Sequence, residues 1–328
     1  MFVSVQRTGI PACNISSHHD VWTCMHARRA FLSPVISRWK HSMPRSIPAQ
    51  SQPHQPGLER LLDPPAEHIR ADYQGSGKLK GRRALVSGGD SGIGRAAALH
   101  FAREGADVAI VYLEEDEDAN ETVRLAQAEG VRALAIRGDV AHSATCDDAV
   151  TRTVQALGGL DIVVNNASVQ YVSNDLTDIS DEVWQRHMDV NINGYFYLTR
   201  AALPHLGRDS VIINTSSVNA FAGNASLVAY TTTKGAEMGF TRALALQLAP
   251  RGIRVNAVAP GPVWTPLQPA SWGPVDPQAV ASLGKDTPLG RIGQPSELGP
   301  AYVYLAARDS SYVTGQTLHV NGGMIING

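Results

Sequence analysis

The sequence predicts an α/β fold, with a single doubly wound domain built around a parallel sheet of seven strands. Two patterns in residues 78–328 carry this prediction. Short apolar runs, rich in Val and Ile and bounded by Gly, Asp or Asn, alternate with longer stretches of helical periodicity. Apolar runs without polar alternation are typical of strands that are buried on both faces. Strict alternation of strand and helix favours right-handed βαβ units in one parallel sheet of the Rossmann type.

The expected elements follow one another from the first strand to the last without an internal repeat. Strands are expected at Ala84–Ser87, Val108–Tyr112, Arg132–Ile136, Leu160–Val164, Val211–Ile213, Val255–Val258 and Thr317–Val320. Helices are expected over residues 92–105, 116–130, 144–157, 180–206, 228–250 and 296–307.

The connection between Thr265 and Ser296 is expected to control substrate specificity. It is rich in proline, and we interpret it as a mobile lid with a short helix near Gln278–Leu283. Trp264 and Trp272 form either an apolar wall for the substrate or ordinary packing beneath the lid. The sequence leaves both interpretations open.

The net charge of −2 conceals two unlike parts of the chain. Residues 1–58 carry a charge of +5, whereas residues 59–328 carry −7. The basic, Ser-rich and acid-poor start is typical of a mitochondrial transit peptide, although we prefer a disordered tail or a start codon placed too early. We therefore divide the chain into a basic extension (1–45), a surface arm (46–77) and a folded domain (78–328).

Composition excludes several classes of protein. A near-neutral charge argues against an electrostatic grip on nucleic acid, and no run of about 18 apolar residues is present to span a membrane. Three cysteines cannot form a disulfide framework, which favours a cytoplasmic protein, or a mitochondrial one if residues 1–45 are a transit peptide. The histidines lack the spacing of metal ligands, so no metal site is expected.

A glycine-rich turn follows the first expected strand and opens the first helix. Gly88, Gly92 and Gly94 let the backbone turn sharply and approach a pyrophosphate held at the helix N-terminus, with Ser91 and Ile93 between them. Because the turn stands after a strand and before a helix at the start of a βαβ series, it predicts a dinucleotide-binding site.

A tyrosine and a lysine in the helix expected over 228–250 point to proton transfer. Tyr230 and Lys234 lie four residues apart, so they share one helix face. A neighbouring ammonium group favours the phenolate and lowers the pKa of a tyrosine from about 10. Hydride transfer to a carbonyl leaves an alkoxide, which needs such a proton donor and a group that holds the oxygen. Ser217 lies at the end of the fifth strand, at the sheet edge where ligands bind.

These motifs together resemble the classical short-chain dehydrogenase/reductase family. Its glycine spacing, Gly-x-x-x-Gly-x-Gly, is present here after Ser87, and its Asn-Ser-Tyr-Lys tetrad is similar to Asn191, Ser217, Tyr230 and Lys234. The resemblance implies that Tyr230 is the general acid/base and that Lys234 tunes it and binds the nicotinamide ribose. Ser217 would then hydrogen-bond the substrate oxygen, and Asn191 would hold a water that relays protons.

The neighbouring Ser216 is the alternative candidate for the serine of this tetrad. The family's separation between serine and tyrosine selects Ser217. Adjacent residues of a strand point to opposite faces, so only one of the two serines can serve the site.

The same resemblance implies further cofactor contacts after the third, fourth and sixth strands. Asp139 and Val140 are expected beside the adenine ring, and Asn166 is expected to brace the sheet at the cofactor. A segment along the nicotinamide completes the set, which comprises Gly88, Ser91, Gly92, Ile93, Gly94, Asp139, Val140, Asn166, Tyr230, Lys234, Pro260, Gly261, Val263 and Thr265.

The choice between NAD and NADP depends on the end of the second strand. NADP-preferring relatives often carry a basic residue where Ser91 stands. Residues 112–116, Tyr-Leu-Glu-Glu-Asp, offer no base for a 2′-phosphate, and their acids begin two residues beyond the strand end. The sequence therefore favours NAD by a small margin.

The sequence thus predicts an oxidoreductase that interconverts a small alcohol, sugar or polyol and its carbonyl with NAD or NADP. Two alternatives stay open: a catalytically silent dinucleotide-binding scaffold or sensor, and a ketoacyl-thioester reductase. Residues 55–59 and 73–81 are similar to a subgroup with an extended N-terminal arm, related to glucose and ribitol dehydrogenases. Residues 313–323 resemble the family's last-strand region, which packs against another subunit and implies a homotetramer.

Overall fold

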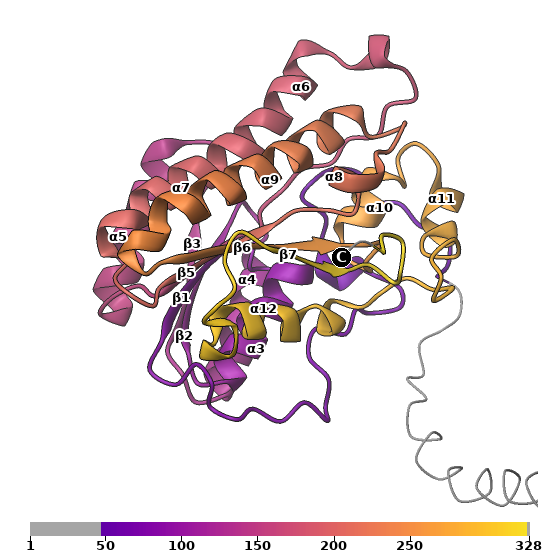
Figure 1. The fold of residues 1–328 in the computed structure, drawn as a ribbon. Coiled ribbons are helices and arrows are strands. Elements are labelled where there is room, and N and C mark those ends of the chain that lie inside the picture. The colour runs from indigo at the N-terminus through magenta and orange to yellow at the C-terminus, as the bar shows by residue number, and fades with distance from the viewer. Residues whose placement is uncertain (1–46, 327–328) are drawn as a thin grey trace, which may run out of the picture. The chain divides into compact units, whose positions relative to one another are not determined.

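Seven parallel strands form one sheet in the computed structural model, which describes residues 47–326 (Figure 1). The spatial order is β3-β2-β1-β4-β5-β6-β7. The chain first adds β2 and β3 on one side of β1 and then adds β4 to β7 on the other side. A ligand crevice is expected at this switch point, outside the carboxyl ends of β1 and β4. The predicted doubly wound α/β fold is confirmed. The strands are β1 (Arg83–Ser87), β2 (Asp107–Tyr112), β3 (Ala133–Arg137), β4 (Ile162–Asn165), β5 (Val211–Thr215), β6 (Arg254–Pro260) and β7 (Thr317–Val320).

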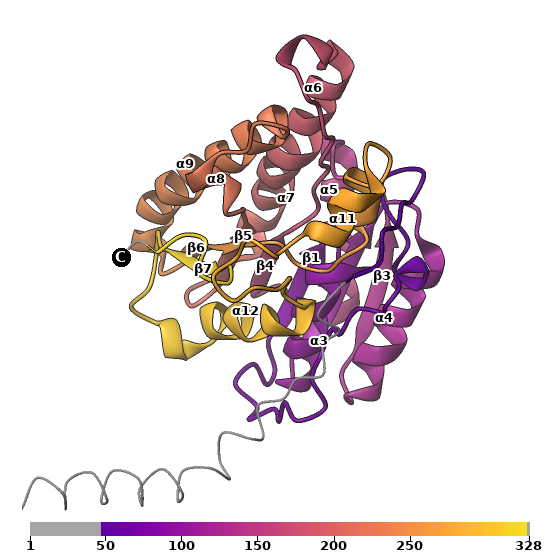
Figure 2. The same ribbon diagram turned by 90° about the vertical axis from the view of Figure 1, so that its right-hand side faces the viewer.

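Helices cover both faces of this sheet (Figures 1 and 2). One face carries α3 (Gly92–Arg103), α4 (Asp116–Ala128) and α12 (Gly299–Ala306), and the other carries α5 (Ser143–Leu157), α7 (Gly194–Ala202) and α9 (Val228–Leu248). Successive side chains of each strand enter opposite cores: Ala84 and Val86 pack on the α3 side, and Leu85 packs on the α5 side. This double burial explains why the strands appear in the sequence as uninterrupted apolar runs.

The helical segment expected over residues 180–206 is present, but its helix type changes along its length. The chain forms α6 (Asp181–His187), a π-helical segment (Met188–Asn193) and α7, followed by a 3₁₀ turn at Leu203–His205. A π-helical segment adds a residue to the turn without interrupting the helical path, and such segments are frequent at functional sites. Asn191 lies within it, fully buried.

Shorter helices gather at the carboxyl ends of the strands, where the arrows of β6 and β7 point in Figure 1. They are α8 (Asn219–Ala222), α10 (Leu267–Ser271) and α11 (Pro277–Ser282). The last of these corresponds to the short helix expected in the lid. In the described part of the chain, no helix is both long enough and apolar enough to cross a membrane.

The arm and the lid share a small apolar core of their own. Ile47 and Leu62 of the arm pack with Trp264, Val280 and Ile292. Trp264 is fully buried, and its indole N–H donates to the Pro64 carbonyl at 2.7 Å. Trp264 therefore holds the arm beneath the lid. Of the two interpretations of this side chain, packing beneath the lid is the one that the structure supports. The proposed basic extension, residues 1–45, lies outside the described residues.

Candidate active site

A cavity of about 700 Å³ opens at the carboxyl ends of the strands, on the crevice expected from the strand order. Its walls come from the loops after β1 to β6, from α9, from the lid and from the arm. It contains fourteen of the sixteen residues expected in the site: Gly88, Ser91, Gly92, Ile93, Asp139, Val140, Asn166, Ser217, Tyr230, Lys234, Pro260, Gly261, Val263 and Thr265. Gly94 and Asn191 lie behind the wall.

The glycine-rich turn has the geometry of a phosphate cradle. Gly88 and Gly92 have φ of +61° and +49°, a left-handed backbone that favours glycine. A Cβ on Gly94 would lie 1.8 Å from the Gly88 carbonyl oxygen, so only glycine lets α3 start this close to the turn. The turn and the helix N-terminus behind it fit the diphosphate of a dinucleotide.

A hydrogen-bonded clamp joins this turn to the loop after β4. The Ser87 hydroxyl accepts from the backbone N–H groups of Asn166 at 2.9 Å and Ala167 at 3.1 Å. The Asn166 side chain donates in return to the carbonyls of Ser87 and Gly88, both at 3.1 Å. Ser87 and Asn166 therefore hold the two loops at a fixed separation across the switch point.

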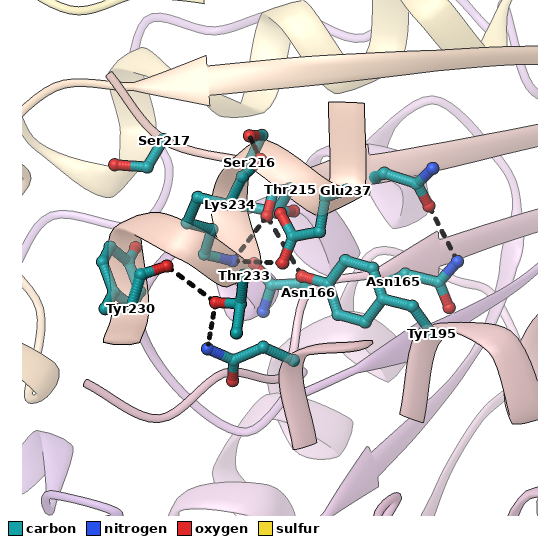
Figure 3. A network of polar contacts seen from close by, with 12 residues as sticks. Asn165, Asn166, Tyr195, Thr215, Ser216, Ser217, Tyr230, Thr233, Lys234 and Glu237 are labelled. Carbon is teal, nitrogen blue, oxygen red and sulfur yellow. Dashed lines mark hydrogen bonds and ion pairs between the residues drawn. The ribbon is translucent and has the colours of Figure 1, made fainter. Parts of the chain in front are cut away.

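Tyr230 and Lys234 project from α9 toward the end of β5, as the helical spacing predicted (Figure 3). The Lys234 ammonium lies 5.3 Å from the centre of the Tyr230 ring and donates to the Thr215 carbonyl at 2.9 Å. Ser216 donates its hydroxyl to the Lys234 carbonyl at 3.1 Å, which commits it to the helix backbone. The Ser217 hydroxyl instead accepts from the Asn219 N–H at 3.1 Å, and Ser217 contributes to lowering the pKa of Tyr230.

The pKa of Tyr230 lies above its usual value of 10, chiefly because burial disfavours the phenolate. Lys234 and Ser217 lower this pKa, and the Glu237 carboxylate on the same helix raises it. The ammonium acts in the direction expected from the sequence. The expectation missed both the burial of the phenol and the presence of Glu237.

Asn191 is held tightly by its neighbours. Its amide donates to the Val169 carbonyl and to the Thr233 hydroxyl, both at 3.0 Å, and its oxygen accepts from the Val169 N–H at 2.9 Å. The side chain therefore joins the loop after β4 to the turn of α9 that carries Tyr230 and Lys234.

Acidic side chains surround the end of the cavity near β2. Asp90 is fully buried, and burial together with the Glu115 carboxylate raises the pKa of Asp90 to about 7. Asp139 accepts from Arg186 at 2.7 Å and from the Ala141 N–H at 2.9 Å, which fixes the loop after β3. This end of the cavity therefore holds several acidic groups, one of which is paired with Arg186.

The arm contributes to the site, and the sequence did not predict this. Gln55 and Gln170 exchange hydrogen bonds across the cavity edge, the Gln170 N–H donating to Gln55 Oε1 at 2.9 Å. The buried Glu59 carboxylate accepts from the Gly92 N–H at 2.8 Å, directly at the start of α3. No pattern in the arm signalled these contacts, because each is a single side chain reaching a backbone group far away in sequence.

Among the described residues, no cluster of three His, Cys, Asp or Glu side chains is placed to hold a metal ion. Trp272 lines the cavity, unlike Trp264, so the two tryptophans have different positions in the lid.

Comparison with known proteins identifies the family. A family model described as enoyl-(acyl carrier protein) reductase matches residues 88–325. A short-chain dehydrogenase from Burkholderia cenocepacia, solved in complex with NADP, is 34% identical, with a TM-score of 0.69, over 75% of this chain and 98% of that one. The chain belongs to the short-chain dehydrogenase/reductase family. The resemblance stated from the motifs is confirmed.

Relatives of this short-chain dehydrogenase/reductase match most of the chain. General stress protein 39 of Bacillus subtilis is 51% identical over 283 residues, which are 86% of this chain and 98% of that protein. A glucose and ribitol dehydrogenase of Daucus carota is 48% identical over 288 residues, 86% of this chain and 98% of that one. The protein is therefore an oxidoreductase that uses a nicotinamide dinucleotide and acts on CH–OH groups.

Proposed function

We propose that this enzyme interconverts a small neutral alcohol, sugar or polyol with its carbonyl, using Tyr230 as general acid/base. The observation that carries the proposal is the position of the Tyr230 phenol in the cavity, beside Lys234 and Ser217. The similarity to a glucose and ribitol dehydrogenase supports a polyhydroxylated substrate.

Each member of the tetrad has a distinct proposed role. Tyr230 gives its phenolic proton to the substrate oxygen during reduction and takes a proton from the alcohol during oxidation. Ser217 donates a hydrogen bond to the same oxygen. Lys234 stabilises the phenolate by its charge and contacts the nicotinamide ribose, and Asn191 holds a water that passes protons to and from Lys234. When bound, the dinucleotide supplies or accepts the hydride.

The cofactor would be held by the residues that line the cavity from the glycine turn to the lid. Ser91, Gly92 and Ile93 line the helix start beside the diphosphate, where the Gly92 N–H already donates to Glu59, and Asp139 and Val140 flank the adenine. Pro260, Gly261, Val263 and Thr265 form the wall beside the nicotinamide.

The test is a panel of sugars, polyols, simple alcohols, aldehydes and ketoacyl thioesters, each assayed with both dinucleotides by absorbance at the nicotinamide band. We expect turnover with hydroxylated substrates of low charge. Turnover confined to the thioesters would favour the ketoacyl reductase. Dinucleotide binding without turnover on any substrate would favour the scaffold or sensor.

We further propose that NAD is preferred to NADP. Leu113 lies at the cavity beyond β2, where a base would meet a 2′-phosphate, and the neighbouring buried acids Asp90 and Glu115 disfavour added negative charge. The Burkholderia relative was solved with NADP, the cofactor that this proposal disfavours, so the cofactor preference needs a direct test.

Leu113→Arg is expected to raise the ratio of kcat/KM for NADP to that for NAD by about tenfold, because guanidinium–phosphate hydrogen bonds are charge-assisted. Steady-state kinetics with both cofactors measure the ratio. Leu176→Arg, on an exposed side chain outside the cavity, is the control and should leave it unchanged. An unchanged ratio in Leu113→Arg would place the 2′-position elsewhere.

For assembly we propose a homotetramer. Large apolar side chains are exposed on α7 and α9, among them Phe196, exposed by 43%, and Leu246, exposed by 80%. Such positions are favourable for burial against a second copy of the chain. Light scattering after size exclusion should give four times the chain mass at micromolar concentration, and a monomer there contradicts the proposal.

We infer a cytoplasmic location, supported by a composition without a disulfide framework. A mitochondrial location is the alternative if residues 1–45 are a transit peptide. N-terminal sequencing of the natural protein distinguishes the two, because a transit peptide is removed on import.

A further inference from the structure

A buried carboxylate faces the lysine of the tetrad (Figure 3). Glu237 lies three residues after Lys234 on α9, on the same helix face, and both side chains are 1% exposed. Glu237 Oε1 accepts from the Lys234 ammonium at 2.7 Å. The other oxygen, Oε2, has no hydrogen-bond partner among the described residues. Glu237 does not line the cavity, so direct contact with a substrate is not its role.

We propose that Glu237 is a positioning residue of this enzyme: its carboxylate holds the Lys234 ammonium against the end of β5 and limits how strongly that ammonium acts on Tyr230. The inference rests on the proposed roles of Tyr230 and Lys234.

The cost of burying Glu237 argues against a role in packing alone. Burying a carboxylate away from water costs folding free energy. Here, in addition, Glu237 Oε2 has no hydrogen-bond partner among the described residues. Replacing Glu237 and Lys234 together by apolar side chains of similar volume would fill the same space at little or no cost in stability. The feature that an apolar residue cannot supply is a negative charge in contact with Lys234.

The contacts of Lys234 show what this charge does. Its ammonium has three N–H donors, and the structure assigns one to the Thr215 carbonyl at 2.9 Å and one to Glu237. The ammonium lies 5.3 Å from the centre of the Tyr230 ring and 5.5 Å from that of Tyr195. The carboxylate thus determines where the ammonium lies and also offsets part of its charge.

Other titratable groups face this pair from three helices. Tyr195 of α7 donates to the Thr215 carbonyl at 3.0 Å, and Tyr302 of α12 shares a hydrogen bond with the Thr215 hydroxyl at 2.7 Å. Burial raises the pKa of both phenols, so they stay neutral. Burial and Lys234 lower the pKa of His187 at the end of α6, so this ring is neutral at neutral pH. Lys234 and Glu237 therefore dominate the field at Tyr230.

Burial raises the pKa of Glu237 to about 7, so above that pH the charges of Lys234 and Glu237 act on Tyr230 in opposite directions. Burial raises the pKa of Tyr230 most, Lys234 lowers it and Glu237 raises it. Oxidation of an alcohol needs the phenolate as base, so kcat/KM rises with pH through the pKa of Tyr230. Removing the negative charge of Glu237 should lower that pKa and move the rising limb to lower pH.

The test is the pH profile of kcat/KM for alcohol oxidation in the full-length enzyme. Glu237→Gln keeps the shape and a hydrogen-bond acceptor but removes the charge. We expect the rising limb of its kcat/KM profile to lie about one pH unit below that of the wild type. Glu237→Asp keeps the charge and should restore a limb close to the wild-type position. A limb in Glu237→Gln that stays in place or moves upward overturns the proposal.

A matched control is Glu104→Gln. Glu104 is another buried carboxylate, bonded to Tyr73 and to the backbone of Ser76 and Lys78, far from the cavity residues. Its loss should lower the melting temperature without moving the limb. If Glu237→Gln does not fold, Glu237→Leu removes the same charge with apolar volume and should show the same shift. Failure of both variants to fold would make Glu237 a purely structural residue and also overturn the proposal.

Tyr230→Phe separates this inference from the proposed function. If Tyr230→Phe keeps turnover and the limb, Tyr230 is not the acid/base and the proposed function fails. If Tyr230→Phe is inactive while Glu237→Gln has the wild-type limb, only the role of Glu237 fails.

Discussion

Tyr230→Phe should reduce turnover by about 10²- to 10⁴-fold, the range for loss of a positioned acid/base. The phenyl ring keeps the packing of a buried side chain, so the cavity retains its shape. The substrate oxygen, however, loses its proton partner in both directions. Affinity for the reduced dinucleotide should stay within about twofold of the wild type, because the phenol is one small part of a large cofactor wall.

Initial rates at saturating substrate measure the first effect, and quenching of protein fluorescence by the reduced dinucleotide measures the second. Tyr312→Phe, at a fully exposed tyrosine, is the control and should behave as the wild type. Full activity in Tyr230→Phe would move the acid/base role to another group. Loss of dinucleotide binding together with turnover would indicate that Tyr230 supports the fold of the site.

The second large effect is expected from Gly94→Ala, which should weaken dinucleotide binding by about 10- to 100-fold. The new methyl group would lie 1.8 Å from the Gly88 carbonyl oxygen and 2.7 Å from the Asn166 side chain. Overpacking of this kind typically costs about 1–3 kcal/mol, and the turn between Gly88 and α3 must open to relieve it. Alanine favours a helix over glycine by about 1 kcal/mol, so a loss cannot be a matter of helix propensity.

Gly207→Ala is the matched control, because a Cβ there meets no atom within 4 Å. Fluorescence titration with the dinucleotide and thermal unfolding are measured on both variants. Unchanged binding in Gly94→Ala would mean that the turn opens freely and that its close approach to α3 is not needed for the cofactor.

Most of the sheet was predictable because its strands are buried on both faces, which leaves an apolar run in the sequence. Tyr230, Lys234 and the glycine turn were predictable because each depends on spacing within a single element. Asn191 lies in the helical segment expected for it, in the part that is π-helical. Periodicity over residues 180–206 does not distinguish an α-helix from one that gains a residue in a π-helical segment.

The contacts that sequence could not predict are those between distant segments. Glu59 meets Gly92 across 33 residues, and Gln55 meets Gln170 across 115. Neither pair has a local pattern, because a side chain that bonds to a distant backbone group needs only length and polarity. Glu237 is an intermediate case: its place beside Lys234 follows from helical spacing, but its burial depends on α7, α12 and β5.

The arm supplies part of the wall of the active-site cavity. Gln55, Pro56 and Gly57 form part of the cavity wall, although they precede the first strand. A protease that cuts after Arg70 would leave every strand of the sheet uncut, and the segment that carries this wall would then be held only by its packing and hydrogen bonds. Such a nicked enzyme should keep its secondary structure by circular dichroism, and loss of the segment would open the cavity wall at residues 55–57. The cavity wall therefore depends in part on residues that precede the catalytic domain.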